Sequence, residues 1–450
     1  MKLFEKLKNL NSLTIFLVLE CLAITSFALG GINIVFYCFG IVVSILCIFQ
    51  SYQLFEKKEL KYLLMFFIPI LILSIFISFG KLLSGQGITN IILLFGFNSF
   101  FIIGICAKKI PSFNKETALL VIGFSIALLI LISMVYSWIN YGFFYVQIHK
   151  DTPIYYYDAI KYDITKEGGF LIGFSFKEVS LLYSGGYGLF LSIYLIALLF
   201  INPKENLKKF LMFLAIGLVG FIYLITIINV KALLFFALIF IFATLYRFLN
   251  DKKYFYKTIK IVFASIYLLL IIFFMIMVIN VTNEGFSSFI ANNAFLNRIF
   301  NTNRIVYEVN IILKEAFKKY NLFGFVDSSL YYETQQTIFL NSGMFEIELL
   351  KESGVFALLL LILIVPLYFI FSMRYLKDDN DNNFIKIITI CLIFGLFIYF
   401  SFENDIAPII HEQNDYHSFF RNPLTLILVF LLGSIYHPFY KREAINNEVK

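Results

Sequence analysis

Long runs of apolar residues, separated mostly by short polar connections, set the pattern of this sequence. Twelve runs are long enough to cross a bilayer, because a hydrocarbon core of about 30 Å requires about 20 residues of helix. The pattern therefore predicts an all-α polytopic integral membrane protein with about 12 transmembrane helices. The runs lie near residues 13–30, 31–49, 62–79, 90–107, 117–140, 179–201, 210–229, 231–249, 260–280, 353–373, 386–402 and 423–438.

The composition agrees with a membrane protein and excludes an ordinary soluble one. Hydrophobic residues make up 60% of the 450 residues and charged residues 14%, against roughly 45–50% and 25% in soluble domains. All five cysteines lie in apolar runs, where a thiol packs as a small apolar group. We therefore expect no disulfide framework and no cysteine metal site, and we expect one transmembrane domain over residues 1–450.

The positions of lysine and arginine predict the orientation in the membrane. With the N-terminus inside, the inner connections and both termini carry 23 of the 36 basic residues. The short outer connections then hold only Lys81 and Lys231. Because basic residues favour cytoplasmic loops, we expect both termini inside. The basic balance thus reflects topology and contact with anionic lipid, and no pattern typical of nucleic-acid binding accompanies it.

Three segments on the predicted outer side are long, at 141–178, 281–352 and 403–422. Loops of this length usually carry function or are disordered, and the many apolar residues here argue against disorder. Residues 303–320 have the apolar spacing of an amphipathic helix, with Ile305 and Val309 on one stripe. That helix either lies flat on the lipid interface or roofs an outward cavity with Arg304 aimed inward. We therefore expect the functional residues to lie on the outer face, which we call the working face.

Ionisable residues are rare inside the predicted spans. Glu20 is the only acid well within a span, and Lys231 is the clearest base at a span mouth. Intramembrane charges often mark function, although Lys231 could instead extend its amine outward to water. Ion-coupled transporters usually need midplane carboxylates and broken helices in related halves. Neither these features nor an internal repeat is visible in the sequence.

Three short motifs share their positions with those of a known family. A turn at residues 229–234 places Lys231 at the opening of a span, where the family often has Arg. Arg304, followed by Tyr307 and Gly324, has the spacing found at the start of the family's large outer loop, and residues 352–354 have its closing Glu-x-Gly pattern. On these motifs the chain resembles the bacterial O-antigen polymerase and ligase superfamily, and the Wzy-type repeat-unit polymerases in particular.

The sequence also departs from the family pattern. A base, a Gly-aromatic pair and Phe-x-Glu-Pro-Ser often precede the sixth span; here Lys166, residues 169–170 and residues 176–180 with Glu178 match, but Val179 replaces the proline. Gly343 and Met344 stand where the family often has His-Asn. The missing histidine counts against a ligase-like mechanism that uses a loop histidine. Glu178 could equally be an acid that stabilises a helix N-terminus.

The resemblance implies a GT-C-like fold and a glycosyltransferase activity at the outer face of the bacterial plasma membrane. The enzyme would transfer a growing glycan from undecaprenyl pyrophosphate to the sugar of another lipid-linked repeat unit, in O-antigen, capsular or exopolysaccharide synthesis. Partners would be these lipid-linked oligosaccharides, membrane lipid and, by analogy, a chain-length regulator and a flippase, with no nucleic acid. The alternatives are an O-antigen ligase and a lipid-linked oligosaccharide flippase or other transporter.

Such a transfer needs cations for the pyrophosphate and a base for the acceptor hydroxyl. The candidate catalytic residues are Arg304, Glu178, Glu346 and His411, and the candidate pyrophosphate-binding residues are Lys231, Arg298, Lys166 and Arg421. We expect no cofactor and no metal. The acids and histidines between residues 405 and 417 form a small cluster, but their spacing fits no recognised metal site.

Overall fold

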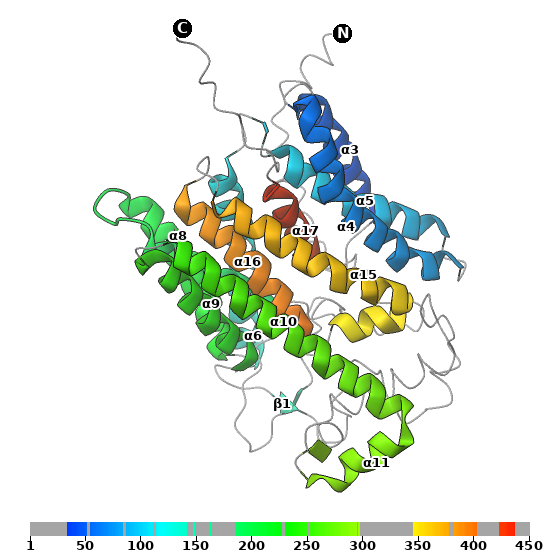
Figure 1. Cartoon of the computed structure of the whole chain (residues 1–450). Coiled ribbons are helices and arrows are strands. Elements are labelled where there is room, and N and C mark those ends of the chain that lie inside the picture. The colour runs from blue at the N-terminus through cyan, green and yellow to red at the C-terminus, as the bar shows by residue number, and fades with distance from the viewer. Residues whose placement is uncertain are drawn as a thin grey trace.

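In the computed structural model of this protein, the described residues form a bundle of helices with one very short strand pair (Figure 1). Strands β1 (Gln147–Ile148) and β2 (Tyr162–Asp163) pair antiparallel. The structure describes residues 34–51, 55–83, 87–107, 109–110, 114–141, 147–148, 162–163, 185–226, 230–249, 252–294, 296–297, 345–377, 382–402 and 423–436. Its helices are α3 (Ile34–Ser51), α4 (Lys57–Leu83), α5 (Gly87–Ala107), α6 (Lys115–Tyr141), α7 (Gly185–Ser192), the 3₁₀ helix η2 (Ile193–Leu199), α8 (Leu207–Thr226), α9 (Val230–Phe248), α10 (Lys252–Thr282), α11 (Glu284–Asn292), α15 (Phe345–Tyr375), α16 (Asn383–Phe402) and α17 (Pro423–Ser434).

The expectation of a multi-pass helical membrane protein is confirmed. Within the described residues, six helices are long and apolar enough to cross a membrane: α4, α6, α8, α9, α10 and α15. Shorter apolar helices occupy five further predicted ranges, in α3, α5, α7 with η2, α16 and α17. The first predicted run, 13–30, and Glu20 lie outside the described residues.

Two predicted spans differ from simple α-helices. The sixth consists of α7, of 8 residues, followed directly by η2, of 7 residues. Since a 3₁₀ helix rises about 2.0 Å per residue against 1.5 Å in an α-helix, the pair still covers about 26 Å. The tenth begins earlier than predicted, at Phe345, and is interrupted at Gly354, where φ is 82° and ψ is −176°. Both irregular helices carry buried residues, so packing rather than propensity sets their shape.

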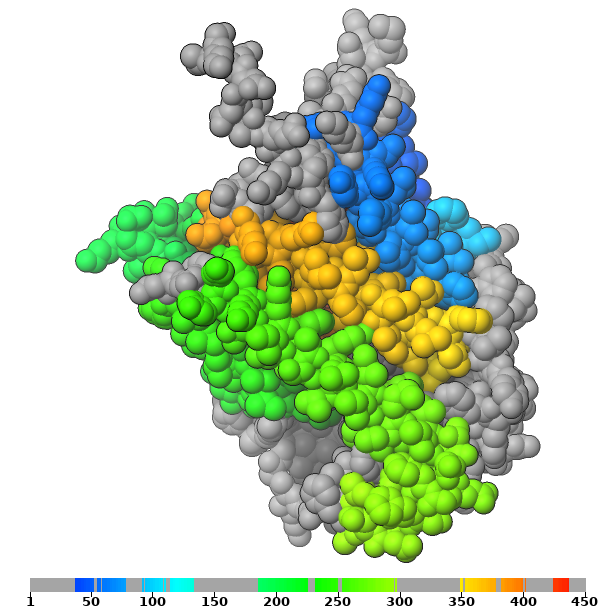
Figure 2. Space-filling view, in the orientation of Figure 1, coloured from blue at the N-terminus to red at the C-terminus, as the bar shows by residue number. Residues whose placement is uncertain are grey.

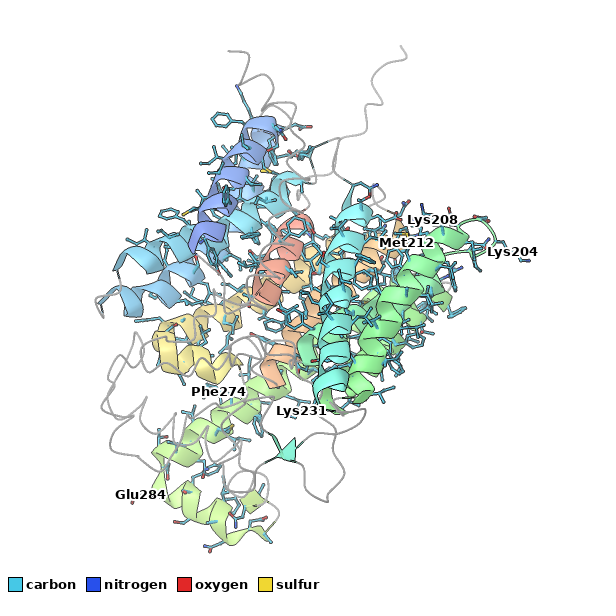
Figure 3. All side chains as sticks on the ribbon, turned by 180° about the vertical axis from the view of Figure 1, so that it is seen from behind. Lys204, Lys208, Met212, Lys231, Phe274 and Glu284 are labelled. Carbon is cyan, nitrogen blue, oxygen red and sulfur yellow. The ribbon has the colours of Figure 1, made fainter. Side chains whose placement is uncertain are left out.

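The two ends of the bundle differ in charge, and each can be named by a labelled lysine. Figure 3 shows Lys204 and Lys208 at one end and Lys231 toward the other, where β1 and α11 with Glu284 also lie. We call these the Lys208 end and the Lys231 end. α8 runs from the Lys208 end to the Lys231 end, and α9 returns to the Lys208 end, where α10 begins. The basic residues that begin α8 and α10 therefore gather at the Lys208 end.

Glycines allow one pair of helices, α5 and α17, to approach closely. A Cβ on Gly104 of α5 would lie 2.2 Å from the Phe430 backbone oxygen in α17, and one on Gly433 would lie 2.2 Å from the Phe101 oxygen. These distances leave no room for a side chain, so the two backbones are in direct contact. Close approach at small residues is the usual way in which membrane helices gain packing energy.

Most buried apolar side chains form one cluster, which extends from Tyr37 in α3 to Tyr436 after α17. α10 packs along one side of it, and the ring of its Phe263 stacks on Phe369 of α15 with centroids 3.7 Å apart. Figure 2 shows α10 as a continuous outer ridge. Only 6% of its apolar span, Lys253–Thr282, is buried inside the protein. Its outer aliphatic side chains are therefore placed to face lipid.

Candidate functional site

The Lys231 end holds the one predicted site residue whose side chain the structure describes. Lys231 is the second residue of α9 and is exposed, whereas the next residue, Ala232, is fully buried. α8 ends at Thr226, so the connection to α9 is short, as the sequence predicts. Lys231 thus places a positive charge at the mouth of a membrane span.

The three long predicted outer segments all join helices at this same end. α6, α10 and α16 begin at the Lys208 end, where Lys115 contacts Tyr375, Tyr256 contacts Leu376, and Lys209 lies over Phe384. They contain 27, 31 and 20 residues, or about 30 Å or more of helix, and so finish at the opposite end. The segments that follow them therefore start from the Lys231 end.

The other predicted residues are not brought together by the described part of the structure. Glu346 lies in the first turn of α15, where only the backbone is described. Lys166, Glu178, Arg298, Arg304, His411 and Arg421 lie outside the described residues, as do the predicted amphipathic helix at 303–320 and the cluster between 405 and 417. Their roles stay predictions.

A small second hydrophobic core lies near the Lys231 end of the bundle. The sequence did not predict it. Met277 of α10, Ile290 of α11 and Leu350 of α15 pack together there. Beside them in sequence, Ser353 is fully buried, and its hydroxyl has no hydrogen-bond partner among the described residues. Ser353 immediately precedes the break at Gly354. The family-like Glu-x-Gly motif therefore marks a place where α15 changes direction inside packed protein.

The Lys208 end is held together by charged side chains. Glu59 of α4 is buried and pairs with Lys109 at 2.8 Å. Lys115, at the start of α6, donates to the Tyr375 hydroxyl at 2.7 Å and to the Ser434 backbone oxygen at 3.3 Å. Only 9% of Lys115 is exposed, which is unusual for a lysine. These contacts join the ends of five helices.

A second ion pair at this end connects α6 to α8, and its lysine also contacts α16. Lys209 of α8 pairs with Glu116 of α6 at 2.6 Å, and its amine lies 4.2 Å from the centre of the Phe384 ring. In the sequence, these lysines indicate only the orientation of the chain in the membrane. The partners Lys115 and Tyr375 are 260 residues apart, and no local pattern joins such distant positions.

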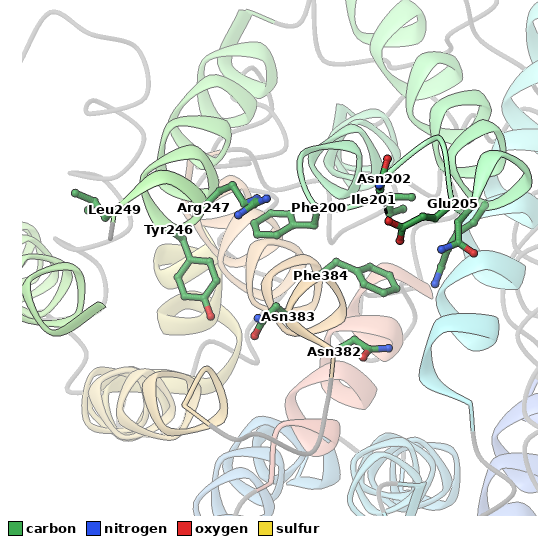
Figure 4. A pocket seen from close by; sticks show the side chains of 12 residues that line it. Phe200, Ile201, Asn202, Glu205, Tyr246, Arg247, Leu249, Asn382, Asn383 and Phe384 are labelled. Carbon is green, nitrogen blue, oxygen red and sulfur yellow. Dashed lines mark hydrogen bonds between the residues drawn. The ribbon is translucent and has the colours of Figure 1, made fainter. Parts of the chain in front are cut away.

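A polar cavity of about 670 Å³ opens between η2, α8, α9 and α16 at the Lys208 end. Figure 4 shows Tyr246 and Arg247 of α9 on one side, Glu205 on the other, and Phe200 and Phe384 between them. Its polar lining also includes Lys209 and four asparagines, Asn202, Asn206, Asn382 and Asn383. This mixture of cations and amide groups suits a small anionic group better than an apolar ligand.

No protein-family model, curated protein or solved structure matches this chain.

In the described ranges, no group of three or more histidine, cysteine, aspartate or glutamate side chains could hold a metal ion. The four described cysteines form no disulfide with one another, and three of them are buried. The features of the described residues that could serve chemistry are therefore charged and polar side chains. One end carries an exposed cation, Lys231, from which the three long segments depart, and the other carries ion pairs and a polar cavity.

Proposed function

We propose that this protein is a bacterial plasma-membrane polymerase of lipid-linked oligosaccharide repeat units. It has 12 spans with both termini in the cytoplasm and a GT-C-like arrangement, and it works on the outer face. The glycan passes from undecaprenyl pyrophosphate to a sugar of another lipid-linked repeat. The family resemblance suggests this activity, and the geometry of the Lys231 end supports it.

The observation that carries the proposal is the departure of all three long segments from the end that exposes Lys231. Segments that begin and end on one side of a bundle can fold over a shared space, even when they are far apart in the sequence. Glu178, Arg304 and His411 lie in three different segments. All three are thereby connected to the same end of the bundle as Lys231.

The reaction forms one bond and breaks one bond at the anomeric carbon of the donor sugar. The oxygen of the acceptor hydroxyl bonds to that carbon, while the bond from the carbon to the pyrophosphate oxygen breaks. The hydroxyl proton passes to a carboxylate or imidazole, for which Glu178, Glu346 and His411 are the candidates. Undecaprenyl pyrophosphate leaves with the electron pair of the broken bond.

The cations have distinct roles in this scheme. Negative charge grows on the departing pyrophosphate, and fixed positive charge at that place lowers the barrier. Arg304 supplies a planar fork that can bind two phosphate oxygens, whereas Lys231 acts as a point charge. Lys166, Arg298 and Arg421 are further candidates for phosphate contact. The outer aliphatic surface of α10 offers the apolar contact that a polyprenyl tail requires.

The test is the length ladder of surface glycan in a strain that lacks the native gene. Wild-type protein should restore the ladder, Arg304→Ala should leave single repeats, and Lys231→Ala should shorten the ladder strongly. Lys81→Ala is the matched control, because Lys81 also lies near the far end of α4 on the predicted outer side. It should restore normal lengths, and equal amounts of inserted protein must be shown for every variant.

Other ladders would overturn the proposal. Normal polysaccharide with both Arg304→Ala and Lys231→Ala would remove the proposed site. In the deletion strain, full-length glycan retained on its lipid carrier would identify a ligase, and repeats trapped in the inner leaflet would identify a flippase.

A further inference from the structure

The polar cavity at the Lys208 end lies where a membrane span meets water. Its lining lies at the ends of two membrane-spanning stretches, Leu207–Ile225 and Lys231–Phe248, and includes Lys209 from the start of the first and Arg247 from the end of the second. A cavity at that depth is level with the headgroups of one bilayer leaflet. Tyr246 shares the lining with the polar groups, and tyrosine is enriched at the lipid interface.

Arg247 is the principal cation of this cavity. Its Nε donates to the Leu199 backbone oxygen at 3.3 Å, and its guanidinium lies 6.0 Å from the centre of the Phe200 ring. These two contacts hold the side chain beside the cavity (Figure 4). In the described part of the chain, Arg247 forms no ion pair with a carboxylate. Its terminal nitrogens carry four further N–H donors.

Two helix N-termini meet at the same cavity. Asn206 precedes α8 and accepts the Phe210 amide with its carbonyl, and Asn382 does the same before α16 for the Lys386 amide. Both asparagines line the cavity. Neither helix has an acid in its first turn, although acids normally offset the positive end of a helix. The cavity therefore receives positive potential from two helices in addition to Arg247.

The remaining charges nearly balance one another. Lys209 lines the cavity but is already paired with Glu116. Among the described residues, Glu205 is the one acid in the lining, and its carboxylate accepts a hydrogen bond from the Asn202 amide at 2.7 Å. Lys204 precedes Glu205 in the same turn, and Lys208 lies in the first turn of α8; Figure 3 shows both lysines at this end. An anion placed beside Arg247 would thus meet net positive surroundings, weakened by Glu205.

We propose that this cavity binds the phosphate group of an anionic phospholipid in the leaflet at the Lys208 end. A phosphate can take the fork of Arg247 and the free amides of a helix start together. The acyl chains of the lipid would extend toward the membrane interior along exposed apolar side chains of α9, which include Leu245 and Ile241. This site is separate from the proposed glycan chemistry and does not depend on it.

The test measures lipid retained by the full-length protein in detergent, by native mass spectrometry after exchange into mixed phosphatidylglycerol and phosphatidylcholine. Wild type should retain phosphatidylglycerol preferentially. Arg247→Gln should lower its apparent affinity about tenfold, the usual effect of losing one charge-assisted contact. Glu205→Gln should raise it severalfold, because the negative charge of the lining acid Glu205 is removed. Lys257→Gln is the matched control: an exposed lysine of α10 outside the cavity, with an expected change below about twofold.

Two results would overturn the proposal: unchanged retention in both cavity variants, or an equal loss in Lys257→Gln, which would mean diffuse surface attraction. Binding of inorganic phosphate by wild type in phosphatidylcholine alone, without preference for phosphatidylglycerol, would assign the site to a soluble phosphate and overturn the lipid as its source. Thermal unfolding without phosphatidylglycerol checks that each variant folds. If Arg247→Gln does not fold, Arg247→Lys and the opposite effect of Glu205→Gln decide the question.

Discussion

At the scale of single residues, space and charge are most constrained where helices touch. Gly104 and Gly433 lie against each other's backbones, so any added carbon must push two helices apart. Lys115 is constrained differently: burial would be costly for its ammonium group without the contacts to Tyr375 and Ser434. Each residue is explained by what it meets across the bundle rather than by its neighbours in sequence.

We expect Gly433→Ala to destabilise the protein by about 1–3 kcal/mol, because overpacking forces backbone shifts. Gly285→Ala is the matched control. A Cβ there would meet only the Asn283 side chain, at 3.3 Å, so its effect should stay within about 0.5 kcal/mol. Thermal unfolding in detergent measures both. Equal midpoints for the two variants would show that α5 and α17 are not in direct backbone contact.

At the scale of elements, polar and charged contacts hold five helix ends together at the Lys208 end, and we call these contacts the clamp. Lys115 joins the start of α6 to the ends of α15 and α17, and Glu59 with Lys109 joins α4 to the end of α5. Tyr436 adds a hydroxyl bond to the Glu59 backbone oxygen at 3.2 Å. Since ion pairs that are partly shielded from water are screened little by salt, this clamp should persist at high ionic strength.

A double-mutant cycle on Lys115→Met and Tyr375→Phe tests the clamp. Hydrogen bonds to a charged group contribute about 1.5–3 kcal/mol, so each single variant should destabilise and the double variant should cost less than the sum of the two. Lys208→Met, an exposed lysine at the same end, should change the free energy of unfolding by less than about 0.5 kcal/mol. Fully additive losses for Lys115 and Tyr375 would mean that the two side chains do not interact.

At the scale of the whole molecule, the charge difference between the two ends predicts the orientation in the membrane. The basic connections belong at the cytoplasmic side, which places α11 outside. A cysteine at exposed Asn292 should therefore react with a membrane-impermeant maleimide in intact cells, whereas one at exposed Lys204 should react only after permeabilisation. The background is a variant whose natural cysteines are replaced by serine. The reverse labelling pattern would invert the proposed topology and move the working face inside.

Helical class and the approximate limits of the spans follow from sequence, because each is a property of a continuous apolar stretch. α8 and α9 begin within a few residues of their predicted limits. The change from α7 to η2 and the break of α15 at Gly354 were not predicted, since both depend on what packs against them. For the site, sequence identified Lys231 as a cation at a span mouth, and the structure finds it exposed there.

By itself, the sequence determined that the chain is a helical membrane protein with charge concentrated at one side, because bilayer thickness and loop charge act on local stretches. Only the tertiary structure decided that Lys115 meets Tyr375, that Gly104 meets Gly433, and that two helix starts and Arg247 surround one cavity. These contacts join positions hundreds of residues apart. Their energies depend on distance in space, which no local pattern of residues specifies.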